Sequence, residues 1–326
     1  MTSHLRWPIA LATLIGLAAA LWAIGKVGFG ALADAALNMG VGGFALFCLG
    51  SVVLSAILGA AWLASMPGQP VRQWPLFTWA RMAREGANDL LPFSQVGGLV
   101  VGARTLTGAR LPGPRVYAAM VVDLTTEMAG QVVFTLFGLV VLGSVLVNGS
   151  EHHVAPLAWL GAGVTIAMTA ALILLQRPML KLAGVLAGAL LPKSQISFDR
   201  LHAELIDIYR RRRAVALSFL FNLLGWLFAA LLGALALLLM GDPLPVWRVI
   251  GLESLIFALR GAAFVVPGAI GVQEAGYVLL GPLLGLDPQA AVALSLIKRA
   301  RDVVIGLPSL VAWQAVEIGL RRVSKA

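Results

Sequence analysis

The stretch VVPGAIGVQEAGYVLL, from Val265 to Leu280, interrupts the most apolar part of the chain. It contains Pro-Gly, two further glycines and the polar pair Gln273 and Glu274. Proline removes a backbone donor and biases the preceding residue away from helix, while glycine permits a tight reversal. A plain membrane span would contain none of these features. The stretch therefore predicts a helix that breaks and turns back within the apolar region.

The composition of the chain predicts an integral membrane protein. Sixty per cent of the 326 residues are apolar and 12% are charged, against roughly 45–50% and about 25% in soluble domains. The net charge of +9 does not indicate nucleic-acid binding, because most basic residues lie in short loops between apolar runs. Cys48 is the one cysteine, which excludes an intramolecular disulfide. The triplet Glu151-His152-His153 has no further ligands beside it, so we expect no metal and no cofactor.

The apolar runs predict six full crossings and two broken segments. A helix needs about 20 apolar residues to cross the hydrocarbon core. The crossings are predicted at 8–24, 41–63, 116–147, 155–175, 214–240 and 289–319. The broken segments, 74–111 and 246–286, each have a proline near the middle, Pro92 and Pro267. The predicted fold class is an all-α polytopic membrane protein with six full crossings and two re-entrant helical hairpins.

The distribution of lysine and arginine favours this path, because cytoplasmic loops are enriched in both. With both termini cytoplasmic, the outer loops contain only Lys26 and Arg248. Arg81 and Arg84 count with the cytoplasmic segments in this path. The segment 196–213 has apolar residues at helical spacing and ends in four arginines, which predicts a cytoplasmic amphipathic helix. The arginines either anchor the chain on anionic headgroups or gather lipid directly.

The two broken segments form an internal repeat. A shift of 174 residues places Gly97 on Gly271 and Gly102 on Gly276. The first hairpin would enter from inside and the second from outside, so the copies are inverted. Inverted repeats with discontinuous helices are typical of transporters whose substrate site lies near the bilayer midplane. The chain, 1–326, is thus predicted to be a single membrane domain: two N-terminal helices (1–73), repeat 1 (74–147), linking helices (148–245) and repeat 2 (246–320).

Charged residues also stand inside the predicted crossings, where a single one costs roughly 2.5–3.5 kcal/mol. Asp123 and Glu127 share a face of one crossing, and the motif KRARD, from Lys298 to Asp302, stands within another. One interpretation is a closed network in which Asp123 and Glu127 pair with Arg299 and Arg301. The other is a midplane polar cavity in which arginines bind the phosphate of a lipid headgroup. Asp89, Glu253, Arg260 and Glu274 from the broken segments join either arrangement.

An enzyme is the rival class of function. The sequence has no soluble catalytic domain, no nucleotide-binding loop after a strand and no Ser/His/Asp set. We therefore expect no enzymatic activity. The alternative is a membrane-embedded transferase with Glu274 or Asp302 as the base.

Three motifs carry a resemblance to a known family. They are the opening stretch, KRARD, and REGANDLLPFSQVGGLVVGAR at 84–104. Together they resemble the flippase-like transmembrane domain of the lysylphosphatidylglycerol synthase superfamily, and within it the hopanoid-biosynthesis-associated membrane proteins. The resemblance covers nearly the whole chain. It implies a multi-pass transporter or flippase of the bacterial inner (plasma) membrane that moves an amphiphilic lipid, a hopanoid or a phospholipid, between leaflets.

The resemblance also implies which residues bind substrate. Leu99 stands where many relatives have an acidic residue, which argues against acidic recognition by the first hairpin. The sequence reaches Ala326 without a synthase domain, so we expect no lipid synthesis. The alternative to transport is a scaffold for a lipid-biosynthesis enzyme; the expected partners are membrane lipids and such enzymes, not nucleic acid. The candidate substrate-binding residues are Asp89, Gln95, Gly97, Gly98, Arg104, Asp123, Glu127, Arg260, Pro267, Gly268, Gly271, Gln273, Glu274, Lys298, Arg299, Arg301 and Asp302.

Overall fold

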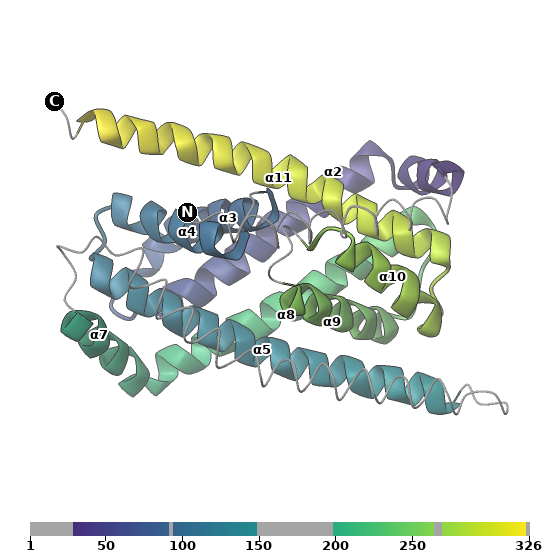
Figure 1. Cartoon of the computed structure of the whole chain (residues 1–326), viewed down its shortest axis with the longest axis horizontal. Coiled ribbons are helices and arrows are strands. Elements are labelled where there is room, and N and C mark those ends of the chain that lie inside the picture. The colour runs from purple at the N-terminus through teal and green to yellow at the C-terminus, as the bar shows by residue number, and fades with distance from the viewer. Residues whose placement is uncertain (1–28, 91–93, 149–197, 264–268, 324–326) are drawn as a thin grey trace, which may run out of the picture. The chain divides into compact units, whose positions relative to one another are not determined.

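The computed structural model describes residues 29–90, 94–148, 198–263 and 269–323 (Figure 1). Within these ranges the chain is all helical, with nine α-helices, one short 3-10 helix and no strands. The all-α part of the prediction is confirmed for these residues. The predicted crossings 8–24 and 155–175 lie outside them, as does the triplet Glu151-His152-His153.

Three of the described helices are long and apolar enough to cross a membrane. They are α2 (Phe29–Ala64), α5 (Gly113–Asn148) and α8 (Arg212–Met240). Their apolar parts, Leu37–Ala64, Gly113–Leu146 and Arg212–Met240, agree with the predicted crossings 41–63, 116–147 and 214–240. The helix α11 (Pro288–Val323) is as long as α5 but carries KRARD, so length and composition alone do not mark it as a span.

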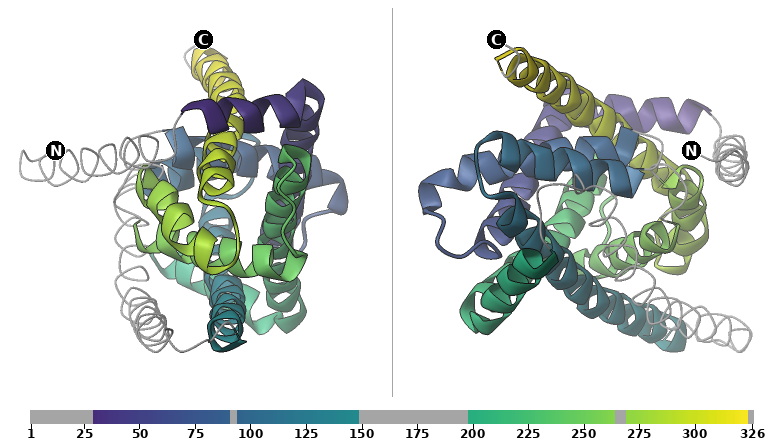
Figure 2. Two further views of the ribbon diagram at one scale, coloured as in Figure 1. Left: turned by 90° about the vertical axis from the view of Figure 1, so that its right-hand side faces the viewer. Right: turned by 60° about the vertical axis from the view of Figure 1, so that its left-hand side comes forward.

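Each broken segment forms two short helices that pack against each other (Figures 1 and 2). The first pair is α3 (Trp74–Leu90) and α4 (Ser94–Gly108), and the second is α9 (Val246–Ala262) and α10 (Val272–Leu283). Glycine permits the close approach in both. A Cβ on Gly102 would lie 3.3 Å from Cβ of Arg84, and one on Gly276 would lie 2.9 Å from Cδ1 of Ile256. The chain therefore folds back on itself at both predicted breaks.

The chain divides into two compact units, and both draw on the same long helices. Unit 1 comprises Met1–Gly50, Gln131–Gln176 and Trp226–Arg301; unit 2 comprises Ser51–Gly130, Arg177–Gly225 and Asp302–Ala326. The unit boundaries fall inside α2, α5, α8 and α11. Unit 2 thus combines the hairpin α3–α4 with the first part of α5 and the last part of α11. Unit 1 combines α9–α10 with the first part of α11 and the last part of α5.

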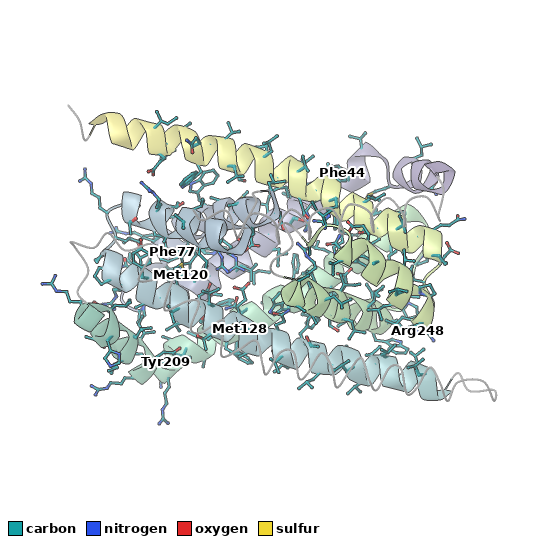
Figure 3. All side chains as sticks on the ribbon, viewed as in Figure 1. Phe44, Phe77, Met120, Met128, Tyr209 and Arg248 are labelled. Atoms are coloured by element: carbon teal, nitrogen blue, oxygen red, sulfur yellow. The ribbon has the colours of Figure 1, made fainter. Side chains whose placement is uncertain are left out.

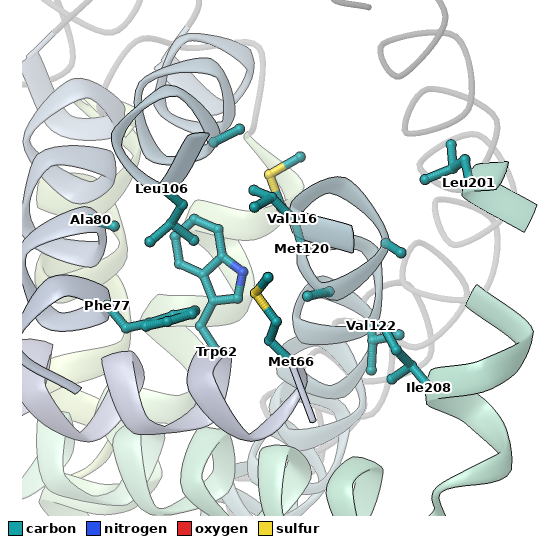
Figure 4. Close-up of a cluster of buried hydrophobic side chains, with 13 residues drawn as sticks. Trp62, Met66, Phe77, Ala80, Leu106, Val116, Met120, Val122, Leu201 and Ile208 are labelled. Carbon is teal, nitrogen blue, oxygen red and sulfur yellow. The ribbon is translucent and has the colours of Figure 1, made fainter. Parts of the chain in front are cut away.

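An apolar cluster around Trp62 holds unit 2 together (Figure 4). The Trp62 indole packs edge-on against Phe77, with ring centroids 6.2 Å apart. Leu106 of α4 and Met120 of α5 belong to the same cluster. The amphipathic helix predicted at 196–213 is α7 (Phe198–Arg210). Its buried residues Leu201 and Ile208 join this core, which fixes α3, α4, α5 and α7 as one bundle.

Unit 1 packs the last part of α5 against α9. The Trp226 ring lies 5.1 Å from that of Phe257 and 6.3 Å from that of Phe134. The Gln131 side chain donates a hydrogen bond of 3.1 Å to the Phe257 carbonyl oxygen. A Cβ on Gly138 would lie 2.9 Å from the Gly251 carbonyl oxygen, so only glycine allows this helix contact.

Candidate functional site: buried charges in each unit

Unit 2 buries two arginines and two carboxylates in one network. Arg81 and Arg84 are one turn apart on α3, and Asp123 and Glu127 are one turn apart on α5. Arg81 lies 2.5 Å from Glu127 and 3.3 Å from Asp123; Arg84 lies 3.0 Å from Glu127 and 3.3 Å from Asp123. Both arginines are at most 2% exposed. The two positive and two negative charges compensate each other, as burial requires.

Polar residues of α8 complete this network. The Asn222 amide donates to Oδ1 of Asp123 and to the Thr126 hydroxyl, both at 3.1 Å. Thr126 and Ser218 form a further hydrogen bond of 2.8 Å. One edge of the network reaches the surface, because the Glu85 side chain, 2.9 Å from Arg81, is 37% exposed.

Unit 1 buries a second, closed network of three residues. Lys298 of α11 forms an ion pair with Glu253 of α9 and donates a hydrogen bond of 2.7 Å to the hydroxyl of Tyr277. The Tyr277 hydroxyl donates in turn to Glu253 at 2.6 Å. The Lys298 ammonium also lies 5.0 Å from the Phe257 ring centroid and 5.4 Å from that of Tyr277. A carboxylate, a hydroxyl and two ring faces thus stabilise one buried cation.

A further ion pair lies at the start of α10. Gly271 has a φ of 81°, which glycine adopts without strain. Its backbone N–H donates to Glu274 Oε2 at 2.6 Å, and Arg299 Nε donates to Oε1 of the same carboxylate at 3.0 Å. The positive end of a broken helix was the predicted place for a headgroup phosphate. Here the chain's own Glu274 occupies it, beside an Arg299 side chain that is 19% exposed.

The networks of the two units use the same positions in corresponding helices. The helices α3 and α9 both have 17 residues, and α5 and α11 both have 36. Arg81 and Glu253 are the eighth residues of α3 and α9. Asp123 and Lys298 are the eleventh residues of α5 and α11. Each eighth residue pairs with the eleventh residue of the next long helix, with the charges reversed between units.

This correspondence corrects the sequence alignment of the repeats. The shift of 174 residues holds for Gly102 and Gly276, which contact the eleventh residues of α3 and α9. The first helices are related by 172 residues and the long helices by 175. A single shift therefore placed Glu127 on Arg301, whereas the helix positions place it on Asp302. The difference arises because the connections between the helices differ in length.

The structure also gives Asp123 and Glu127 partners that the sequence did not suggest. Arg299 and Arg301 were the expected cations, and Arg81 and Arg84 were counted with cytoplasmic segments. Arg81 and Arg84 lie buried in α3 instead, so they do not report on topology. Tyr277 and Asn222 also escaped sequence reasoning. The available signal was spacing, since Arg81 and Arg84 share a helix face as Asp123 and Glu127 do.

The remaining candidates lie in different surroundings. The Arg301 guanidinium lies 5.5 Å from the Phe47 ring centroid, and Asp302 is buried. Arg104 pairs with Glu317 at 2.5 Å on an exposed side of unit 2. Gln273 is fully buried and donates to the Ser295 hydroxyl at 3.0 Å.

Other candidates are partly exposed or lack described side chains. Asp89 and Arg260 are partly exposed. Gly98 packs on Asn88, whereas a Cβ on Gly97 would meet nothing within 4 Å. Gln95 begins α4 without a described side chain, and Pro267 and Gly268 lie outside the described residues. Within the described ranges, no three His, Cys, Asp or Glu side chains are placed to hold a metal ion.

Long apolar helices that bury compensated charges define a helical integral membrane protein. A family model described as the lysylphosphatidylglycerol synthase TM region matches residues 9–309, and the chain belongs to this family. The resemblance found in the sequence is thereby confirmed for the superfamily, which links the chain to lipid modification or transport. Comparisons with curated proteins and with solved structures gave no match.

Proposed function

We propose that this protein is a lipid transporter that moves an amphiphilic lipid between membrane leaflets, without enzymatic activity. One observation carries the proposal: both units bury an ion pair at the same positions of corresponding helices. Charge in a membrane protein is costly and marks substrate pathways more often than it marks stability. A pair of corresponding units around broken helices is the architecture of secondary transporters.

The proposed topology has six crossings, two re-entrant hairpins and both termini in the cytoplasm of a bacterial cell, with the protein in the inner membrane. The order of the chain supports an inverted repeat. The helix α5 begins in unit 2 and ends in unit 1, whereas the corresponding helix α11 begins in unit 1 and ends in unit 2. Corresponding helices that traverse the units in opposite order are what an inverted repeat requires.

In the proposed mechanism, the Arg299 and Glu274 pair receives the headgroup. A headgroup phosphate has the charge and acceptor oxygens to replace the Glu274 carboxylate on Arg299 and on the Gly271 N–H. The Glu253, Tyr277 and Lys298 network stays closed and holds α9, α10 and α11 in register. The proposed cargo is a phospholipid or a hopanoid with a polar headgroup, the hopanoid resting on resemblance alone.

Leaflet exchange in proteoliposomes tests the proposal. Purified protein should accelerate exchange of a labelled anionic phospholipid, and Arg299→Gln should remove about nine-tenths of the gain, because a charge-assisted hydrogen bond contributes about 1.5–3 kcal/mol. Arg72→Gln is the matched control, since Arg72 is an exposed arginine of unit 2 outside these networks. Wild-type protein that leaves exchange at the lipid-only rate would refute transport of this lipid. Acceleration that survives Arg299→Gln would refute the site.

A further inference from the structure

A surface hollow lies where α7 meets the start of α8, apart from the buried networks. Its volume is about 580 Å³. Tyr209 projects from α7 at this surface (Figure 3). The lining combines two arginines and a histidine with an aromatic ring and two aliphatic side chains: His202, Leu205, Ile206, Tyr209, Arg210 and Arg212.

The positive charge at this hollow is not compensated by the acidic residues of α7. Glu204 lies 3.4 Å from Arg115, and Asp207 lies 3.3 Å from Arg211, so both carboxylates already have cationic partners. Arg210 and Arg212 are exposed and form no ion pair within the described residues. The lining therefore offers two guanidinium groups to an anion from outside the chain.

The position along α8 indicates the depth of the hollow in the membrane. Arg212 is the first residue of α8 and of the apolar stretch Arg212–Met240. A helix of 29 residues is about 44 Å long at 1.5 Å per residue, which matches the roughly 40–45 Å of a bilayer with its headgroups. Arg212 thus belongs at the level of the lipid phosphates. The exposed Ile206 and Tyr209 side chains lie at the same level, where aromatic and aliphatic groups contact acyl chains.

We propose that this hollow is a binding site for an anionic phospholipid. Arg210 and Arg212 bind the phosphate through their forked donors, and Leu205, Ile206 and Tyr209 contact the upper part of an acyl chain. The site is separate from the proposed transport route and does not depend on it. It assigns a ligand to two of the four consecutive arginines, which a general attraction to the membrane would use equally.

Native mass spectrometry of the full chain in detergent tests this site with dioleoyl phosphatidylglycerol as the probe. The wild type should retain one phosphatidylglycerol in preference to phosphatidylcholine. Arg210→Gln with Arg212→Gln should weaken this binding about tenfold, because two charge-assisted contacts are lost. Arg211→Gln with Arg213→Gln is the matched control, since it removes the same charge from residues that do not line the hollow, and it should change binding less than about twofold.

Three outcomes would overturn the site. Equal weakening in the two double variants would show a diffuse basic surface instead of a site. Equal retention of phosphatidylcholine would remove the role of net charge, and displacement of the lipid by millimolar glycerol 3-phosphate would assign the site to a soluble phosphate. Ile206→Trp gives an independent check if the arginine variant does not insert, because it fills the hollow at constant charge and should also release the lipid.

Discussion

Asp123 and Lys298 are the eleventh residues of two 36-residue helices, and each pairs with the eighth residue of the 17-residue helix that opens its own repeat. The charges are opposite in the two repeats. An exchange of partners between repeats would bring Arg81 against Lys298 and Glu253 against Asp123. Like charges in an apolar surrounding are strongly unfavourable. The reversal therefore specifies which hairpin pairs with which long helix.

The first prediction concerns the closed network of unit 1. Glu253→Gln leaves the Lys298 ammonium buried without its carboxylate, and Lys298→Met leaves the carboxylate without its cation. Each should destabilise the protein by about 3–5 kcal/mol, whereas the double variant should recover much of this loss. Thermal unfolding in detergent, arranged as a double-mutant cycle, measures the coupling. Losses that simply add would show that the two groups do not depend on each other.

A second prediction separates two adjacent glycines of α4. A Cβ on Gly98 would overlap the Asn88 side chain and lie 2.6 Å from the Arg84 carbonyl oxygen, while one on Gly97 meets nothing within 4 Å. Gly98→Ala should destabilise by about 1–3 kcal/mol through overpacking between α3 and α4. Gly97→Ala should be neutral or stabilise by up to about 1 kcal/mol, because alanine favours helix. The same unfolding assay compares them, and equal midpoints would contradict the close packing of the hairpin.

Much of the fold was predictable from the sequence because its signals are local. Length and apolarity marked the helices at 41–63, 116–147 and 214–240, and proline marked both breaks. The pairing of Arg81 and Arg84 with Asp123 and Glu127 was not predictable in this way. It depends on which helix face meets which, and arginine in an apolar helix reads locally as a loop residue.

The sequence also located the candidate site only in part. Glu274 and Arg299 were both named as candidates, and they lie together. Their pairing was missed, since Glu274 was assigned to the cavity and not to the N-terminus of its own helix. The spacing from Gly271 to Glu274 is that of a helix-capping interaction, and this was the signal available in the sequence.

A third prediction separates the two members of the Glu274 and Arg299 pair. Arg299→Gln should weaken binding of an anionic lipid and raise its half-saturating concentration about tenfold, because the phosphate loses a charge-assisted donor. Glu274→Gln should act in the opposite direction on binding. Without the competing carboxylate, Arg299 holds the headgroup more tightly, so half-saturation should fall together with the maximal exchange rate.

Exchange rates in proteoliposomes over a range of lipid content provide the measurement. Glu253→Gln is a useful comparison, since it alters a closed network of the same unit and should lower the amount of folded protein and leave half-saturation unchanged. A parallel rise of half-saturation in Arg299→Gln and Glu274→Gln would contradict the competition between Glu274 and the headgroup.

The fourth prediction tests both hairpins by their ends. Arg72 and Arg110 flank the pair α3–α4, and Asp242 and Asp287 flank the pair α9–α10; all four are exposed. A re-entrant hairpin returns to the side it entered, so both ends of one pair must be accessible from the same side of the membrane. Single cysteines at these four positions, in a Cys48→Ser background, should react with a membrane-impermeant maleimide in two matched pairs.

Intact spheroplasts and inverted vesicles distinguish the two sides. Cysteines at Arg72 and Arg110 should react only in inverted vesicles, and those at Asp242 and Asp287 only in spheroplasts, since the positive-inside rule places the first pair in the cytoplasm. Labelling of the two ends of one hairpin from opposite sides would make that hairpin a full crossing. Because one extra crossing reverses every later segment, it would also place the basic run Arg210 to Arg213 and the C-terminal arginines on opposite sides or both outside, against the strongest topological signal in the chain.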